Sequence, residues 1–543
     1  HAIRKLLAKK VHDQIEDPIP QEILKKYNLP SLASSLVYIH APKNMKQAQA
    51  SRKRFAFEEI FSIQISRGIA RRIFNSKKGF IVKKNELLSK QFLSRFPFTP
   101  TEAQLKAFDH ISTDFSSGMP MMRLLEGDVG SGKTLVAALA AHATANVREK
   151  GMPLQVAYMA PTEILARQHF ESFCSYFKGT DINIGLITGK DARKFPSKID
   201  PASHTDISRT QLLKWLSEGA IHILIGTHAV IGEKVKFSKL ALAIIDEQHR
   251  FGTNQRLKLA QKHTHAPHFL SMTATPIPRS LALTIYGDLD LTLLDELPVG
   301  RKKVATEIIV ARNRDSMYFR AKKELLAGHQ AFVVCPRIEE PDPEKELALS
   351  ARSTIAEGKR LAEKEFKGFR IAILHSKILP AEKDRIMRDF SLHKYDILVS
   401  TSVIEVGVNI PNATVMIIEG AERFGLAQLH QLRGRVARSS DQAYCFLASD
   451  SKTAEANKRL KALTEAKNGF ELAELDLSIR GAGELSGNRQ WGLSDVAMEA
   501  LKNMRLVEAA REEARTLLDA DPTLANHKAL AVRSHTSNAI HFE

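Results

Sequence analysis

One stretch of the chain, GDVGSGKT at residues 127–134, has the residue types and spacing of a phosphate-binding loop. It fits G-x-x-x-x-G-K-[ST], follows an apolar run at 121–125 and precedes an Ala- and Leu-rich run, which predicts a strand, a glycine loop and a helix in that order. In such a loop the glycines let backbone N–H groups turn toward phosphates, the lysine reaches the terminal phosphates, and the hydroxyl can ligate Mg²⁺. The loop predicts a nucleoside triphosphate site, and the alternative is a glycine-rich turn without a ligand. The residues assigned to this site are Gly127, Gly130, Gly132, Lys133 and Thr134.

A second chemical element is the acid pair Asp246 and Glu247, at the end of the apolar run ALAIID. Phosphoryl transfer needs positioning and charge compensation more than covalent chemistry. We therefore expect Asp246 to hold Mg²⁺ through water and Glu247 to polarise the attacking water. Acid pairs at strand ends are commonly no more than solvated surface, and it is the glycine loop upstream that favours the catalytic interpretation.

A parallel sheet would bring these two elements together, and the sequence predicts one. From Phe96 to about Asp295, short apolar runs alternate with helical patterns, and each run ends in polar or small residues. Ligands are expected at this carboxyl edge of the sheet. The expected strands are Leu124–Glu126, Val156–Met159, Ile221–Gly226, Leu242–Asp246 and Phe269–Met272.

The rest of the chain divides into three further regions. Residues 1–95 are expected to be a helical linker with one long amphipathic helix at 45–74, and residues 451–543 are expected to be helical apart from a glycine-rich segment at 476–492. Between 296 and 450 the alternation of strands and helices resumes without a second glycine loop, so the first sheet domain is 96–295 and the second is 296–450. The strands expected in the second are Ala331–Cys335, Arg370–Leu374, Ile397–Ser400, Val415–Glu419 and Ala443–Leu447.

Composition limits the class of protein. The 543 residues are too many for one core and should form three or four domains. Lys and Arg number 79 against 61 Asp and Glu, a net charge of +18, which favours a polyanionic partner over the alternative of a basic solvated surface. The three cysteines fit neither a zinc site nor a disulfide framework and indicate a reducing compartment. No run of about 18 uncharged apolar residues and no signal-peptide core is present, so we expect neither secretion nor membrane insertion.

Three further motifs carry a resemblance to a known family. The acid pair stands in DEQH, together with TATPIPR at 273–279 and QLRGRVAR at 431–438, and this set resembles the superfamily 2 helicases. The segment DLSIRGAGELSGNRQWG at 476–492 resembles the translocation motif shared by RecG and the transcription-repair coupling factor. The resemblance to the RecG family runs from about residue 52 to 503. It implies an α/β fold of two tandem RecA-like parallel-sheet lobes, with an N-terminal helical linker and a mostly helical C-terminal translocation region.

The same resemblance implies an ATP-dependent DNA helicase, a DNA-stimulated ATPase, that remodels stalled replication forks and Holliday junctions in recombination and repair. The implied cofactors are ATP and Mg²⁺. The implied partners are branched double-stranded DNA and a single-stranded-DNA-binding protein, and we expect a monomer in the bacterial cytoplasm without membrane contact. The chain begins at His1 without an initiator Met, so we expect a fragment or processed start from which the family's N-terminal wedge domain is missing.

The resemblance also assigns residues around the first lobe. Phe98 and Gln104 in PFTPTEAQ would recognise adenine, because an amide has the donor and acceptor that an adenine edge requires; the alternative for Gln104 is a surface position on a helix. Small polar residues at strand ends would line the path of one DNA strand, and they suit helix caps equally well. These residues are Thr162, Gly189, Thr227 and His228.

In the second lobe, Arg435 and Arg438 would act as arginine fingers that stabilise transition-state charge from across the cleft. Gln431 would report the nucleotide state, and Thr401 would contact DNA. The coupling of the ATP site to this lobe is assigned to Thr273, Thr275 and His249, the last of which has a purely structural role as its alternative.

In the translocation segment, Arg480, Arg489 and Gln490 would transmit lobe closure to a helix that levers duplex DNA, and the alternative is a glycine-rich surface loop. Some positions depart from the family pattern, but none removes a charged group required for hydrolysis, so activity is still expected. These positions are Ser376, Asn409, Ala437 and Ala482.

Three other functions compete with this one. The motor of a transcription-repair coupling factor is disfavoured by the lack of a polymerase-interaction region, and an RNA helicase is disfavoured by the family resemblance alone. A nucleic-acid-binding scaffold with a degenerate ATP site is disfavoured because the charged residues needed for hydrolysis are intact. Those residues are Lys133, Asp246, Glu247, Arg435 and Arg438.

Overall fold

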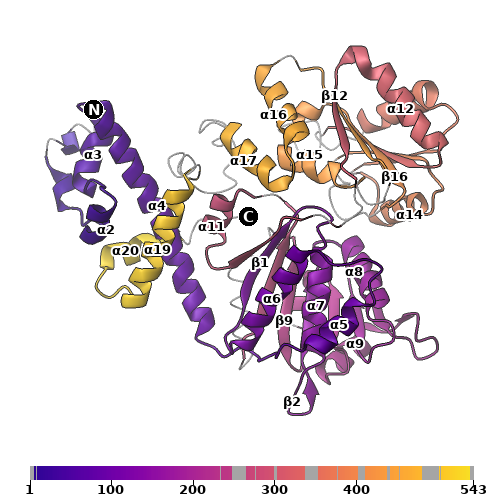
Figure 1. The fold of residues 1–543 in the computed structure, drawn as a ribbon, viewed down its shortest axis with the longest axis horizontal. Helices are drawn as coiled ribbons and strands as arrows, with labels where there is room; N and C mark the ends of the chain where they lie inside the picture. Colours follow the sequence, from indigo (N-terminus) through magenta and orange to yellow (C-terminus); the bar gives the residue numbers. More distant parts are fainter. Residues whose placement is uncertain are drawn as a thin grey trace.

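The structure is a computed structural model that describes residues 5–7, 9–232, 234–247, 265–275, 277–296, 298, 302–336, 353–375, 377–401, 410–436, 441–451, 453–479, 501 and 503–537. Within these residues the chain forms two lobes, each built on a sheet, and a helical body made from both ends of the chain (Figure 1). No helix in these ranges is long and apolar enough to cross a membrane.

Among the described residues, the first lobe has a nine-stranded sheet with the order β11-β1-β10-β9-β4-β8-β5-β6-β7. Neighbours from β11 to β5 are parallel, and β6 and β7 extend the edge as antiparallel strands. The central strands are buried on both faces, which is why they read as continuous apolar runs. The strands are β1 Met122–Gly127, β4 Gln155–Met159, β5 Ile184–Ile187, β6 Ala192–Phe195, β7 Thr205–Asp206, β8 Ile223–Gly226, β9 Leu240–Asp246, β10 His268–Thr273 and β11 Asp290–Leu294.

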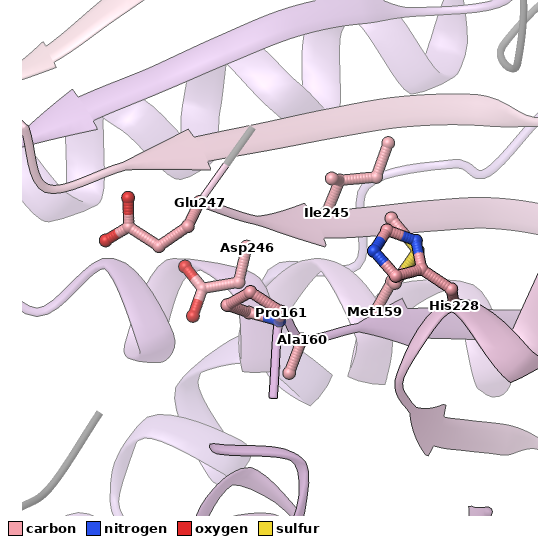
Figure 2. Close-up of a pocket in the computed structure, with 7 residues that line it drawn as sticks. All are labelled: Met159, Ala160, Pro161, His228, Ile245, Asp246 and Glu247. Atoms are coloured by element: carbon pink, nitrogen blue, oxygen red, sulfur yellow. The ribbon is translucent and has the colours of Figure 1, made fainter. Parts of the chain in front are cut away.

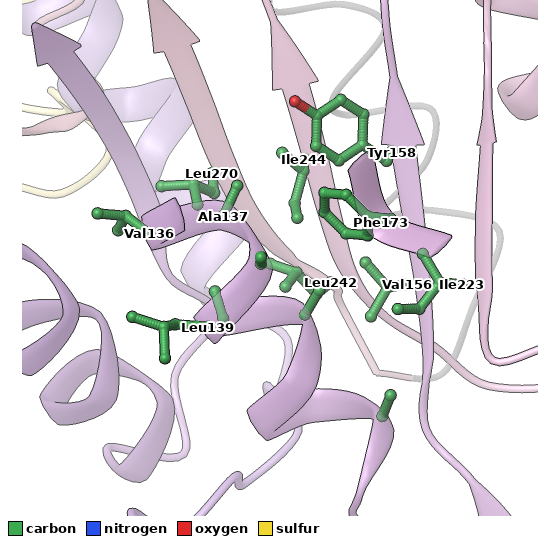
Figure 3. Close-up of a cluster of buried hydrophobic side chains, with 14 of the residues drawn as sticks. Val136, Ala137, Leu139, Val156, Tyr158, Phe173, Ile223, Leu242, Ile244 and Leu270 are labelled. Carbon is green, nitrogen blue, oxygen red and sulfur yellow. The ribbon is translucent and has the colours of Figure 1, made fainter. Parts of the chain in front are cut away.

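Helix α7, Lys133–Ala145, packs on this sheet directly after the glycine loop. All its residues from 135 to 142 are buried, because small Ala side chains let the helix approach the strands closely. Figure 3 shows Val136 and Leu139 of α7 in one cluster with Leu242 and Ile244 of β9 and Leu270 of β10. This packing fixes the start of α7 relative to the ends of β1 and β9. The other helices of the lobe are α5 Glu86–Leu93, α6 Glu102–Ser116, α8 Glu163–Tyr176, α9 Arg209–Ser217 and α11 Arg279–Ile285.

The second lobe has, within the described ranges, a sheet of six parallel strands in the order β12-β17-β16-β13-β15-β14. Alternate residues of its strands enter different cores: Phe332 lies in the cluster with Met416, and Val333 lies in the cluster with Ile417. The strands are β12 Ala305–Ile309, β13 Gln330–Val334, β14 Ile371–Leu374, β15 Ile397–Ser400, β16 Ala413–Ile418 and β17 Tyr444–Ala448. The helices are α12 Arg314–Leu326, α14 Pro380–Ser391, α15 Leu426–Arg433, α16 Ala454–Glu465 and α17 Gly469–Ile479.

The helical body is organised on α4, Met45–Asn75, which begins where Asn44 Oδ1 accepts a hydrogen bond from Gln47 N at 3.0 Å. The C-terminal helix α19 lies alongside α4 (Figure 1), and Phe57 and Phe61 of α4 share a core with Val507 of α19. The remaining helices of this body are α2 Gln21–Lys26, α3 Leu32–His40, α19 Met504–Ala520 and α20 Lys528–Ser537.

Helix α4 is also bound to the first lobe. Gln64 Nε2 donates to Leu283 O of α11 at 2.8 Å, and the Arg71 guanidinium donates to both carboxylate oxygens of Asp290 at 3.0 and 2.6 Å. A bidentate pair of this kind fixes direction as well as distance. The helical body is therefore held at the β11 edge of the first sheet.

The α/β class with two parallel-sheet lobes and helical ends is confirmed. The predicted long helix is α4, and the predicted strands overlap β1, β4, β8, β9 and β10 of the first lobe and β13 to β17 of the second. Strands β5, β6, β7, β11 and β12 were not predicted. Most of these are edge or near-edge strands with polar or glycine residues, and pairing with a neighbour, rather than their own pattern, makes them strands.

Candidate functional site

The glycine loop joins the end of β1 to the start of α7 and is shaped by close contact. Gly132 has φ of 86°, and a Cβ atom there would lie 2.2 Å from Gln104 Nε2 of α6. A side chain at this position would suffer both backbone strain and a clash. A cradle of bare backbone at a helix N-terminus fits a phosphate group.

Gln104 braces this loop from α6. Its Nε2 donates to Ser131 O at 2.7 Å, and its Oε1 accepts from Thr101 N at 3.0 Å, which completes a capping box at the start of α6. The side chain is 1% exposed, so it is not the surface residue of the alternative interpretation. Phe98, which is 45% exposed, lies near Phe96 with ring centroids 5.6 Å apart. The adenine contact of Phe98 and Gln104 stays a prediction.

Lys133 lies at the first position of α7, and its ammonium is turned back over the loop. Nζ donates to Gly127 O at 2.7 Å and to Asp128 O at 3.0 Å. Thr134 follows it in the first turn of α7, where a hydroxyl can face a ligand at the helix start. The glycine cradle, the ammonium and the hydroxyl together form a donor set that fits a triphosphate with Mg²⁺.

Asp246 and Glu247 stand at the carboxyl end of β9, which is separated in the sheet from β1 and its glycine loop by β10 alone. Asp246 Oδ2 lies 2.9 Å from His169 Nε2 of α8, and the His169 ring also contacts the Tyr158 hydroxyl. Burial alone would raise the pKa of Asp246, but the hydrogen bond from His169 and the charge of Lys133 hold it below its usual range. The carboxylate is thereby kept ionised, as a metal ligand must be.

Glu247 has φ of 53°, a conformation that L residues adopt only under constraint. Figure 2 shows it beside Asp246 at a small hollow that opens to solvent. The hollow is lined by Met159, Ala160, Pro161, His228, Ile245, Asp246 and Glu247. The acid pair and the DNA-path candidate His228 thus line the same hollow.

Strand β10 carries Thr273 to the same edge, because Glu126 of β1 pairs with Thr273 and Asp246 of β9 pairs with Met272. Thr273 Oγ1 lies 2.6 Å from Thr275 Oγ1 and accepts from Thr275 N at 3.2 Å. Two residues later, Ile277 N donates to Glu126 Oε1 at 2.9 Å. The TATPIPR motif is thereby tied to the strand that leads into the glycine loop.

The second lobe reaches the glycine loop through α15. His430 Nε2 lies 2.5 Å from Asp128 Oδ1, and a Cβ atom on Gly434 would meet Val129 Cβ at 2.7 Å. Gln431 lies in α15, and Arg435 directly follows Gly434, the C-cap residue that contacts Val129. Arg438, the second predicted finger, lies outside the described residues.

The DNA-path candidates sit at strand ends, as expected. Thr162 caps α8 by accepting from Leu165 N at 3.3 Å, Gly189 N donates to Glu163 Oε1 at 2.9 Å, and Thr227 directly precedes the short 3₁₀ turn His228–Ile231. Thr401 follows β15 and is buried, and its carbonyl accepts from Ser400 Oγ at 2.8 Å. Thr162 is therefore a helix cap, whether or not it also contacts DNA.

Several predicted residues lie outside the described part of the chain. They are His249, Ser376, Asn409, Ala437, Arg438, Arg480, Ala482, Arg489 and Gln490. Sequence reasoning did not single out four residues that the structure joins to the site. They are Glu126, Asp128, His169 and His430. Asp128 lies inside the glycine loop and His430 directly precedes the motif QLRGRVAR, so their proximity to motifs in the sequence could have identified them. His169 lies on α8, away from any motif, and no sequence signal identified it.

Models of known protein families match three parts of the chain. The model of the DEAD/DEAH box helicases matches residues 101–284, and the model of the helicase conserved C-terminal domain matches residues 318–440. A third model, described as "ATP-dependent DNA helicase RecG, domain 3, C-terminal", matches residues 466–533.

Curated relatives and a solved structure agree with these matches. The ATP-dependent DNA helicase RecG of Synechocystis sp. is 42% identical over 96% of this chain, and the chain spans 60% of that relative's length. The Bacillus subtilis RecG is 40% identical over 94% of this chain, which covers 71% of the relative. A structure of RecG bound to a three-way DNA junction matches with a TM-score of 0.73 and 37% identity, over 91% of this chain and 62% of that one. The chain belongs to the RecG family of ATP-dependent DNA helicases.

Proposed function

We propose that this chain is an ATP-driven DNA translocase that remodels branched DNA, such as stalled replication forks and Holliday junctions, in recombination and repair. The observation that carries the proposal is the contact of α15 with the glycine loop, because it gives one ATP site to two lobes. Hydrolysis at such a site changes how the lobes sit on each other, which is what a motor requires. The relative solved on a three-way junction supports branched DNA as the substrate class.

The roles proposed in hydrolysis follow from position and charge. Lys133 compensates phosphate charge, Thr134 and Asp246 hold Mg²⁺, and Glu247 orients the attacking water. When bound, Mg²⁺ would neutralise developing phosphate charge. His169 keeps the Asp246 carboxylate ionised and oriented.

The second lobe supplies the opposite wall of the site. Arg435 and Arg438 are proposed as arginine fingers, and Gln431 as a reporter of the nucleotide state. Phe98 and Gln104 are proposed at the adenine side. The DNA track is proposed along Thr162, Gly189, Thr227, His228 and Thr401, and force transmission at Arg480, Arg489 and Gln490.

The remaining features of the proposal concern organisation. The chain is proposed to divide into a helical linker region at 1–95, RecA-like lobes at 96–295 and 296–450, and a translocation region at 451–543. It is proposed to act as a monomer in the bacterial cytoplasm and to meet single-stranded-DNA-binding protein on the same DNA.

The test is steady-state ATP hydrolysis by the chain with four DNAs at one salt concentration: a fork, a Holliday junction, a linear duplex and a single strand. Turnover is expected to rise most with the fork and the junction. Glu247→Gln should remove it with every DNA, whereas Glu171→Gln, at an exposed position on α8, should leave it intact. Equal stimulation by linear duplex and fork would overturn branch specificity, and no stimulation by any DNA would overturn the motor.

A further inference from the structure

Asp128, the second residue of the glycine loop, is held by two elements that lie far away in the sequence. Its Oδ1 is 2.5 Å from His430 Nε2 of α15 and also accepts from Val129 N at 2.7 Å. Its Oδ2 accepts from Gly469 N, the first amide of α17, at 3.2 Å. Two of the three hydrogen bonds on this carboxylate therefore join the loop to α15 and α17.

The hydrogen-bond network sets the direction of the contact with His430. Arg433 NH2 lies 2.8 Å from His430 Nδ1, and Arg433 NH1 donates to Leu463 O of α16 at 2.8 Å. A guanidinium can only donate, so Nδ1 carries the lone pair and Nε2 carries the hydrogen that points at Asp128. Asp128, His430, Arg433 and the end of α16 thus form one continuous chain.

Electrostatics and packing both favour this arrangement. Burial alone would raise the pKa of Asp128, but the hydrogen bonds from His430 and Val129 N and the positive charge of Arg433 lower it to about 2. The ionised carboxylate also faces the N-terminus of α17, where the helix dipole favours negative charge. Beside it, Val129 fills the space that the missing side chain of Gly434 leaves.

We propose that Asp128 is a positioning residue that reports the state of the glycine loop directly to α17, in parallel with any signal through the proposed fingers Arg435 and Arg438. The last residue of α17 is Ile479, directly before the arginine at position 480 of the translocation segment. A loop that rearranges around phosphates must shift Asp128, because Lys133 Nζ holds the carbonyl of this same residue at 3.0 Å. Any such shift pulls on the first turn of α17. The inference rests on the proposed function of the loop and deepens it.

The first test follows α17 without turnover. Hydrogen–deuterium exchange of the peptide covering 466–472 is measured with and without a non-hydrolysable ATP analogue and Mg²⁺, at a concentration that saturates each variant in a separate binding titration. In the unmodified chain the analogue should change exchange at 466–472. In Asp128→Ala that peptide should exchange faster without nucleotide, since Gly469 N–H loses its acceptor, and the analogue should no longer change its rate.

A matched control variant breaks a different contact between the two lobes. Asp384→Asn removes the ion pair with Arg167, whose nitrogen lies 3.4 Å from the Asp384 carboxylate, a contact between α8 and α14. This variant should retain the response of 466–472 to the analogue. A response that persists in Asp128→Ala, or that is absent from the unmodified chain while the ATPase panel succeeds, would overturn the inference and leave the proposed function standing.

The second test asks whether the contact acts through its hydrogen bonds. His430→Gln can donate to Asp128 and accept from Arg433, whereas His430→Leu can do neither. The ratio of DNA-stimulated to basal ATP turnover should fall about tenfold in His430→Leu and largely recover in His430→Gln, within the range of measured couplings between sites. Combining Asp128→Ala with His430→Leu should add little further loss, and full additivity of the two changes would show that the residues act independently.

Discussion

Glu126 makes the stability of the first lobe depend on pH. It is the residue before the glycine loop, at the end of β1, and it is only 1% exposed. Its Oε1 accepts from Ile277 N at 2.9 Å, and its Oε2 has no hydrogen-bond partner among the described residues. Burial raises the pKa of this carboxyl to about 7, against smaller opposing effects of the Ile277 hydrogen bond and the Lys133 charge.

The size and sign of the effect follow from linkage. The pKa of this carboxyl is 4.5 in the unfolded chain and about 7 in the folded one, so the folded chain binds the proton more tightly. Its contribution to stability is complete below pH 4.5 and is lost as the pH rises through 7, a total of roughly 3 kcal/mol. Between pH 5 and pH 7 the loss is about 2 kcal/mol.

Glu126→Gln removes this dependence, because an amide of the same shape does not titrate. Its Oε1 can still accept from Ile277 N, while both hydrogens of its Nε2 are buried without an acceptor among the described residues, which costs about 1–3 kcal/mol at every pH. The free energy of unfolding of the unmodified chain minus that of the variant should therefore fall by about 2 kcal/mol from pH 5 to pH 7, whatever its absolute value.

The assay needs a reporter of the first lobe alone, since a chain of several domains does not unfold in one step. The sequence has two tryptophans, and replacing Trp491 by Phe leaves Trp215, on α9 of the first lobe, as the fluorescent reporter during urea unfolding. Glu171→Gln in the same background controls for removal of an exposed carboxylate. The reasoning would be refuted if the free energy of unfolding of the parent minus that of Glu126→Gln stayed constant from pH 5 to pH 7, or if it increased.

Three further changes have defined outcomes. Lys133→Ala should lower ATP turnover at least about a hundredfold, measured as phosphate release, because no other ammonium is held over the loop among the described residues. Gln104→Ala should lower the stability of the first lobe by about 1–3 kcal/mol, because it leaves Ser131 O and Thr101 N without their partner, and it should raise the Kd for an ATP analogue. Urea unfolding followed by Trp215 fluorescence measures the first effect, and a binding titration measures the second. Arg71→Ala, in a double-mutant cycle with Asp290→Ala, should show a coupling of about 0.5–1 kcal/mol, since this pair between α4 and β11 is partly exposed.

The parts of the fold that local pattern determines were predictable. The order of β1, glycine loop and α7 lies within one continuous stretch, and both the buried run of β9 and its terminal acid pair are visible in ALAIID and the residues after it. Helix α4 has a cap, a long periodic run and no internal proline. In each case the information needed for the prediction lies within about 30 residues.

Contacts between distant segments were not predictable in this way. Asp128 reads as one of the variable positions of the glycine loop, and only the fold of the second lobe brings His430 to it. Gln104 looks like an adenine ligand or a surface residue until α6 is placed over Ser131. The return of α19 to α4 depends on the sum of many apolar contacts, which no motif in either helix encodes.

Two routes lead from the glycine loop and the residue before it to α17 and to the core that contains α19. One runs from Asp128 to the first amide of α17, which ends at Ile479. The other runs from Glu126 to Ile277 N, and the Ile277 side chain is buried in the core that unites α4, α11 and α19. Helix α19 begins at Met504 and contributes to this core, so Glu126 and Ile277 join the start of the glycine loop to the core of α19. A change at the loop can therefore act on α17 through Asp128 and on the core of α4, α11 and α19 through Glu126, and the two effects are separable because the two carboxylates have different partners.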